Sequence, residues 1–335
     1  MGRSLSDSGV SSCAFSDCNS DRSDEFSAAD SGLLHRHLIS CSAEYDDEVV
    51  RGLVSHLESP SASLEVQRCA AMEIRLLAKH KQDNRLKIAR AGAITPLISL
   101  LSHSDPVLQE NGVTAILNLS LCDENKDLIA AAGAIKPLIS ALQAGTSAAR
   151  ENAACALLRL SQIEEHKISI GRSGAIPHLI NLLQNGGLRG KKDASTALYS
   201  LCSTTENKIR AVQAGAIRPL LDLMADPESG VVEKAAYVLY AIIGVPEGRV
   251  AAVEEGGIPV LVDVIEDGRR RQKEIAASSL LLMCEENVRC CDMAAREGVI
   301  PPLVGLSQSG SSRAKQKAEA LIKLLRQPRA AVGDL

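Results

Sequence analysis

The sequence predicts an all-α solenoid of about six repeated three-helix units, with a partial unit at the amino-terminal end. Three observations predict it. One short motif recurs at a constant spacing along the chain, the signature of a repeat architecture. Apolar residues follow helical spacing and do not alternate as in a strand. Aromatic residues make up only 2% of the 335 residues, with no Trp, so the core has to consist of small and aliphatic side chains in closely stacked helices.

The recurring motif begins with a glycine and continues with an apolar pair and, in most copies, a proline. The first five glycines are spaced 41 residues apart and the sixth follows after 42: Gly92, Gly133, Gly174, Gly215, Gly256 and Gly298. We expect each glycine to end a short first helix, because glycine adopts the left-handed conformation without strain. The proline then fits the first turn of a second helix, where its missing N–H is not needed.

The first helix of several units has an asparagine near its start, at Asn84, Asn125 and Asn207. Asparagine is a favoured N-cap residue, so we expect these side chains to accept hydrogen bonds from the first free backbone amides. His166 stands at the same position in another copy, and we expect it to have the same capping role. A longer third helix completes each unit.

The ends of the chain differ from the repeats. Residues 46–326 form the predicted array, 1–45 a predicted disordered segment and 327–335 a short tail. Twelve of the first 45 residues are Ser, with Asp interleaved, which leaves too little apolar surface to offset the entropy of ordering. The first six residues fit the pattern for myristoylation at Gly2, and Cys13 or Cys18 could accept a second acyl chain. Nearby acidic residues would oppose binding to anionic lipid.

Composition excludes several classes of function. The net charge is −4, and no basic stripe favours nucleic acid. The ten cysteines include no C-x-x-C pair, and the seven histidines do not recur at metal-ligand or catalytic spacing. We therefore expect no enzymatic activity, no cofactor, no metal and no small-molecule substrate. No apolar run of membrane-spanning length and no signal peptide is evident, so we expect a cytoplasmic or nuclear protein with reduced thiols.

Together with this period, several segments resemble the armadillo repeat family over residues 46–326, and within it the armadillo region of plant U-box proteins. The narrower resemblance rests on five segments: 70–79 (AAMEIRLLAK), 109–111 (QEN), 117–120 (LNLS), 150–154 (RENAA) and 314–318 (AKQKA). The resemblance implies a right-handed armadillo α-solenoid. No segment resembles a U-box, so it implies a partner-binding region without ligase activity of its own.

In the family, the third helices line a concave groove that holds the partner. The resemblance therefore makes eight residues candidates for partner binding: Thr114, Asn118, Arg159, Lys192, Thr196, Ser200, Lys234 and Tyr237. Armadillo import receptors repeat a Trp and, four residues later, an Asn. Only Asn118 and Tyr237 keep part of that pattern, in different units, so we do not expect an import receptor. The alternative for these polar residues is that they form the solvated face of the third helices.

The resulting hypothesis is a monomeric, non-catalytic adaptor or scaffold that binds a protein partner, in plant signalling or ubiquitin-linked regulation. One alternative is a substrate-recognition subunit associated with an E3 ubiquitin ligase. Another is a membrane scaffold anchored through lipid at Gly2, which would associate with a membrane only when acylated.

Overall fold

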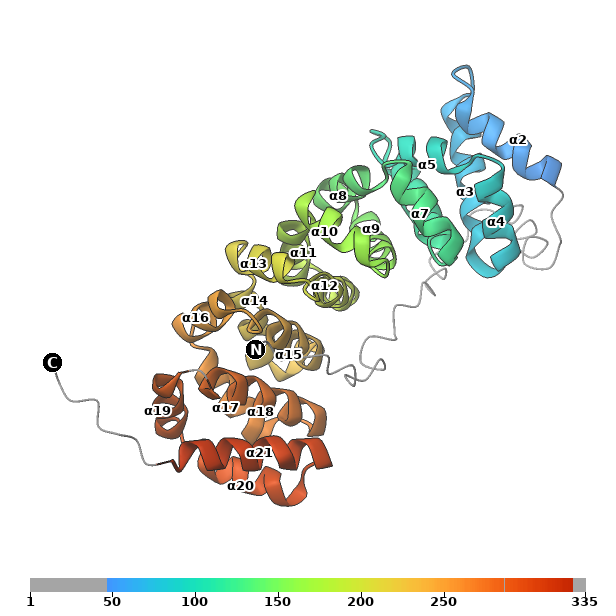
Figure 1. Ribbon diagram of the computed structural model, residues 1–335. Coiled ribbons are helices and arrows are strands. Elements are labelled where there is room, and N and C mark those ends of the chain that lie inside the picture. Colours follow the sequence, from blue (N-terminus) through green and yellow to red (C-terminus); the bar gives the residue numbers. More distant parts are fainter. Residues whose placement is uncertain (1–46, 286, 328–335) are drawn as a thin grey trace.

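The computed structural model describes residues 47–285 and 287–327, which Figure 1 shows as a long, curved array of helices. Within these residues the chain forms twenty α-helices and one short 3-10 helix, and no strand. The predicted all-α architecture is therefore confirmed. The predicted disordered segment and the lipidation candidates Gly2, Cys13 and Cys18 lie outside the described residues.

The helices follow the predicted order of one partial unit and six complete units. The partial unit consists of α2 (Asp47–Glu58) and α3 (Leu64–His80). The complete units are α4 (Gln82–Arg90), α5 (Ile94–Leu100) and α6 (Pro106–Leu119); α7 (Asp123–Ala131), α8 (Ile135–Ala144) and α9 (Ser147–Leu160); α10 (Glu164–Arg172), α11 (Ala175–Asn185) and α12 (Leu188–Leu201); α13 (Thr205–Gln213), α14 (Ile217–Ala225) and α15 (Val232–Ile242), with the 3-10 helix η2 (Pro227–Ser229) between the last two; α16 (Pro246–Glu254), α17 (Gly257–Asp267) and α18 (Arg270–Glu285); α19 (Val288–Arg296), α20 (Ile300–Ser309) and α21 (Ser312–Leu325).

The third helices stack on one another along the whole array. Each contacts the next, from α3 through α6, α9, α12, α15 and α18 to α21. Figure 1 shows the array bending as an arc, with α9, α12, α15 and α18 toward its inner side. We call the surface built by these seven helices the third-helix face. It is the surface on which the eight candidate residues lie.

The recurring glycines end the first helices as expected. All six have a positive φ, between 72° and 91°, the left-handed region that favours glycine. At the end of α4, the amide of Gly92 donates to the carbonyl of Ala89 and that of Ala93 to the carbonyl of Ile88. This closing pattern satisfies carbonyls that the helix end would otherwise leave without a donor.

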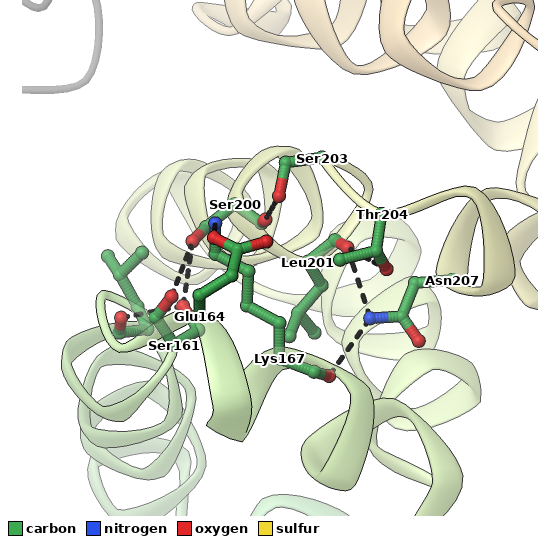
Figure 2. Close-up of polar contacts among 9 residues, drawn as sticks. Ser161, Glu164, Lys167, Ser200, Leu201, Ser203, Thr204 and Asn207 are labelled. Atoms are coloured by element: carbon green, nitrogen blue, oxygen red, sulfur yellow. Dashed lines mark hydrogen bonds and ion pairs between the residues drawn. The ribbon is translucent and has the colours of Figure 1, made fainter.

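The expected capping role of the repeated asparagines is wrong. Asn84, Asn125 and Asn207 are the third residues of α4, α7 and α13, and their side chains are buried. The Asn207 amide donates to the carbonyl of Leu201 at 3.0 Å and to that of Lys167 at 2.9 Å (Figure 2). Because each first helix begins directly after a third helix, its start lies beside carbonyls that need donors.

The same arrangement links neighbouring units. Asn125 donates to Leu119 at the end of α6 and to Arg85 in α4 of the preceding unit, at 3.1 and 3.2 Å. His166 occupies the equivalent third position of α10, and its Nε2 lies 3.3 Å from Oδ1 of Asp127 in α7. His166 therefore faces the preceding unit and does not cap its own helix.

The core consists of Leu, Ile, Val and Ala with a few Met and Cys, and no aromatic side chain belongs to its fully buried set within the described residues. Small residues permit close helix contacts. A Cβ built on Gly112 in α6 would lie 2.8 Å from Cβ of Leu100 in α5.

Within the described residues, no single helix is long and apolar enough to cross a membrane. The helices α7 and α8, which meet at an angle of 87°, are together long and apolar enough, by length and composition alone.

Candidate functional site

Side-chain caps hold the amino-terminal ends of the third helices α6, α9 and α21. Asp105 accepts from the amide of Leu108, Thr146 from that of Ala149, and Ser311 from that of Ala314, at 2.9 to 3.1 Å. Each satisfies one of the free amides of the first turn. These caps fix where α6, α9 and α21 start, whereas α12 and α15 begin after Gly187 and Val231 without a side-chain cap.

Glutamates at one repeated position connect four third helices to the first turn of the next one. Glu110 accepts from the Thr146 hydroxyl at 2.9 Å, and Glu274 accepts from the Ser311 hydroxyl. The equivalent Glu151 and Glu233 lie 3.7 and 3.6 Å from arginines in the first turns of α12 and α18. A carboxylate near a helix amino terminus is favoured by the helix dipole, so these acids stabilise the stack.

Lys192 replaces glutamate at this position in α12. It is half-buried, and within the described residues no carboxylate lies within ion-pair distance of it. The next third helix, α15, lies against α12. Lys192 therefore adds a positive charge at the middle of the array, at the position where α6, α9, α15 and α18 have a glutamate.

Three of the eight candidate residues are buried. Thr114, Asn118 and Thr196 retain 8%, 2% and 4% of their surface. Their polar groups bond to the chain itself. Asn118 donates to the carbonyl of Arg75 at 3.0 Å, and Thr114 accepts from Asn152 at 2.9 Å.

This burial corrects the expectation that these three side chains face a partner. The adjoining third helices cover them, which a residue type alone cannot reveal. They order the third-helix face and contribute little of its accessible surface.

The other five candidates remain partly accessible: Arg159, Lys192, Ser200, Lys234 and Tyr237. Ser200 in α12 shares a hydrogen bond of 2.8 Å with Ser161, the residue that follows α9 (Figure 2). Lys234 in α15 donates to the Thr196 hydroxyl in α12 at 3.3 Å. These contacts hold polar side chains of neighbouring units in defined positions on the face.

All aromatic rings of the described Phe, Tyr and Trp residues gather at one place on this face. They are Tyr199 in α12 and Tyr237 and Tyr240 in α15, all half-buried. The rings of Tyr199 and Tyr237 meet edge to face, with centroids 6.1 Å apart, a favourable geometry for aromatic pairs. Burial raises the pKa of both Tyr199 and Tyr237, so both hydroxyls stay protonated at neutral pH and remain hydrogen-bond donors.

Tyr199 and Tyr240 were not among the candidates, although the sequence contained a signal for them. The two residues are 41 positions apart, so they occupy the same place in consecutive units. Tyr237 lies three residues before Tyr240 on the same helix. The repeat period together with helical spacing predicts that the three rings lie near one another.

The third-helix face has the chemistry of a binding surface. No group of three or more His, Cys, Asp or Glu residues in the described part of the chain could hold a metal ion. Burial raises the pKa of the Cys202 thiol to about 12, which makes it a poor nucleophile. What the face offers is a cluster of three tyrosines, with Arg159 on the neighbouring α9; tyrosine and arginine are among the residue types enriched at the centre of protein interfaces.

Comparison with known families and sequences shows similarity to plant proteins. The family model of the plant U-box protein ARM repeat region matches residues 48–330. The chain is 54% identical over 74 residues to U-box domain-containing protein 4 of Arabidopsis thaliana, which covers 22% of this chain and 9% of that protein. It is 53% identical over 75 residues to E3 ubiquitin-protein ligase SPL11 of Oryza sativa subsp. japonica, covering 22% and 10%. The matched segments thus span about a tenth of these relatives.

Solved structures share the fold. An engineered protein is 26% identical, with a TM-score of 0.74 over 82% of this chain and 68% of its own. A designed armadillo repeat protein in complex with the peptide (KR)4 is 20% identical, with a TM-score of 0.54 over 82% of this chain and 99% of its own. The predicted resemblance to armadillo repeats, and to those of plant U-box proteins, is confirmed.

Proposed function

The chain belongs to the family of plant U-box protein ARM repeat regions, and on that premise we propose that it is a non-catalytic scaffold that binds a protein partner on its third-helix face. Every unit contributes one helix to this surface, so a partner that spans several units would lie along it. The finer part of the proposal is a role as an adaptor in plant signalling or ubiquitin-linked regulation, in the cytoplasm or nucleus.

The tyrosine cluster is the observation that carries the proposal. In a chain with only four tyrosines and no tryptophan, three rings lie together on adjacent third helices. Arg159 in α9 and Lys234 in α15 are half-buried on the same face. Tyrosine and arginine are over-represented among residues whose removal weakens protein interfaces most. Rings that are already packed lose little conformational freedom when a partner binds.

A double variant tests the location of the site. Three baits are compared in plant extract: the wild-type chain, the variant Arg159→Ala/Tyr237→Ala and the control Lys136→Ala/Arg218→Ala. Proteins that are lost only with Arg159→Ala/Tyr237→Ala are retained as partner candidates. Lys136 and Arg218 are exposed residues of the second helices α8 and α14. Their pair removes two positive charges from another face, against one in the Arg159/Tyr237 variant, so it is the stricter control for a loss of charge.

We expect the Arg159/Tyr237 variant to bind a purified candidate about 30-fold more weakly, corresponding to roughly 2 kcal/mol at interface hot spots. Calorimetry gives the affinities, and circular dichroism checks that both variants remain helical. Loss of binding in the control pair with retention in the Arg159/Tyr237 pair would place the partner on another face and refute this site.

A substrate-recognition role with an E3 ligase is the second candidate, favoured by the name of the rice relative, E3 ubiquitin-protein ligase SPL11. Its test is a reconstituted ubiquitination reaction. We expect the purified chain alone to transfer no ubiquitin in the presence of activating and conjugating enzymes. Autoubiquitination under those conditions would contradict the non-catalytic proposal.

A further inference from the structure

Charge is unevenly distributed between the faces of the array. From α9 onward the third helices carry thirteen basic and six acidic residues: Arg150, Arg159, Arg189, Lys191, Lys192, Lys234, Arg270, Arg271, Lys273, Arg313, Lys315, Lys317 and Lys323 against Glu151, Asp193, Glu233, Glu274, Glu285 and Glu319. The second helices of the same units carry two basic and four acidic residues: Lys136 and Arg218 against Asp222, Asp263, Glu266 and Asp267. A chain with a net charge of −4 therefore presents a positive third-helix face.

The acids on this face are largely engaged in contacts between units. Glu151 lies beside Arg189, Glu233 beside Arg271, and Glu274 accepts from Ser311. Asp193 is buried and lies 3.5 Å from Arg189. These ion pairs cancel cations together with acids, and Glu274 is held by a neutral hydroxyl. The third helices from α9 onward still carry seven more basic than acidic residues (thirteen against six), and this excess sets the sign of the potential toward solvent.

These cations form a series with one member on each of the last five third helices. The series consists of Arg159 in α9, Lys192 in α12, Lys234 in α15, Arg271 in α18 and Lys317 in α21. Arg271 keeps 53% of its side chain exposed, and the other four are half-buried. We call this series the basic ladder. The tyrosine cluster lies at its middle, on α12 and α15.

We propose that the third-helix face binds an extended, acidic segment of a partner protein, with its carboxylates on the basic ladder and an apolar side chain against the tyrosines; this inference rests on the proposed scaffold function. Packed helices lie about 8–10 Å apart, and an extended chain advances about 3.3 Å per residue. An acidic residue at every third position therefore matches the spacing of Lys192, Lys234, Arg271 and Lys317, which lie within the first six residues of their helices. Arg159 lies near the other end of α9 and stands apart from this row.

Features of the face favour a protein segment over a nucleic acid. Glu151, Glu233 and Glu274 lie between the cations along the stack, so positive charge recurs only at intervals, whereas a nucleic acid carries one phosphate at every nucleotide. The aromatic rings of the face occur at one place only and pack against one another, whereas nucleic-acid channels present successive rings for stacking bases. A peptide needs a single apolar anchor and spaced cations, which this face supplies.

The experiment compares two labelled octapeptides, (DE)4 and (KR)4, and the RNA octamer U8 by fluorescence anisotropy with the full-length protein. Eight extended residues span about 26 Å, enough to reach Lys192, Lys234 and Arg271 together. We expect (DE)4 to bind, more weakly as the salt concentration rises, and to bind at least about tenfold more tightly than either (KR)4 or U8.

Charge variants locate the contact. Lys192→Glu/Lys234→Glu should weaken (DE)4 binding at least about tenfold, and Lys136→Glu/Arg218→Glu on the second helices less than about twofold. If Lys192→Glu/Lys234→Glu loses helicity, the variant Lys192→Gln/Lys234→Gln provides the same test. It removes the two positive charges without adding a negative charge near Glu233. Equal weakening by the ladder and control variants would overturn the assigned location.

Three other outcomes overturn the inference while separating it from the proposed function. Binding of (KR)4 that is lost in Tyr237→Ala would leave the face as a protein-binding site with the opposite charge preference. Binding of U8 as tight as that of (DE)4 would replace the protein segment by a nucleic acid. Binding of no probe would refute the acidic-segment assignment, and the scaffold proposal would then depend on the Arg159/Tyr237 pull-down alone.

Discussion

Gly171 in α10 and Asn207 in α13 are matched across the boundary between two units. A Cβ built on Gly171 would lie 1.9 Å from Oδ1 of Asn207, far inside van der Waals contact. The Asn207 amide cannot move away without losing its hydrogen bonds to Lys167 and Leu201. The equivalent positions in two other first helices are Ala89 and Ala130, so this boundary has its own packing requirement.

Gly171→Ala should destabilise the array although alanine is the better helix former. Inserting a methyl group into a packed contact costs about 1–3 kcal/mol, which exceeds the gain of about 1 kcal/mol from replacing a helical glycine. Urea unfolding followed by circular dichroism measures the change. Gly52→Ala in α2, where nothing lies within 4 Å of the built Cβ, should stabilise. When Asn207 is also replaced by Ala, Gly171→Ala should lower the free energy of unfolding by less. An unchanged loss would show that the contact between Gly171 and Asn207 is not its cause.

Asn207→Ala should itself lower stability by about 2 kcal/mol, because two hydrogen bonds of about 1 kcal/mol each are lost. The Leu201 carbonyl keeps its contacts with the Thr204 amide and hydroxyl. The loss should concentrate at the boundary between the units of α12 and α15. Hydrogen exchange of these segments, read by mass spectrometry, locates it. Asn185→Ala, at the exposed end of α11, is the matched control and should change exchange little. Uniform loss of protection along the whole array would argue against a local link.

The ion pair between Asp105 and Arg68 should make stability depend on pH. The hydrogen bond from Arg68, together with that from the Leu108 amide, lowers the pKa of Asp105 to about 2. A carboxyl whose pKa is lower in the folded than in the unfolded chain stabilises the fold above the unfolded value, about 3.9. That contribution is lost as the pH falls toward about 2.

Asp105→Asn keeps an N-cap acceptor and removes the charge. The variant should have a lower urea midpoint than wild type at neutral pH, and the difference should close as the pH falls from about 4 toward about 2. Asp263→Asn, an exposed residue of α17, should differ little from wild type throughout. A difference between Asp105→Asn and wild type that persists at low pH would assign the effect to something other than the charge.

Thiol reactivity should separate the cysteines by burial. Cys69 in α3 is exposed, and Cys202 is buried with a pKa raised to about 12. Only the thiolate reacts with maleimides, so N-ethylmaleimide should modify Cys69 in the native protein and Cys202 only after unfolding. Peptide mass spectrometry over time gives both rates. Equally fast labelling of Cys202 would mean that α12 opens readily.

The sequence predicted the architecture well because the repeat period carries several signals that agree. Gly92 and its equivalents, the prolines that follow them and the apolar spacing all indicate the same three-helix unit. The role of Asn207 was not predictable in the same way. An asparagine at the start of a helix has the same sequence signature whether it caps that helix or donates to the helix before it.

For the candidate site, the period assigns residues to the third helices, and Arg159, Lys192, Lys234 and Tyr237 are partly accessible there. Their contact with a partner stays a prediction. The burial of Thr114 and Thr196 depends on how closely the adjacent third helices pack, which the repeat pattern does not specify. Tyr199 and Tyr240 were overlooked because the import-receptor comparison considered only two positions per unit.

The hydrogen bonds that join neighbouring units have a consequence for how the chain folds. The residues they connect are about one unit apart in the sequence: 40 positions for Asn207 with Lys167, 38 for Asn152 with Thr114 and 39 for Ser200 with Ser161. The entropy of closing a loop grows with its length, so each added unit closes a loop of nearly constant size, wherever it lies in the array. Folding can therefore begin in a central pair of units and extend in both directions at a constant cost for each step.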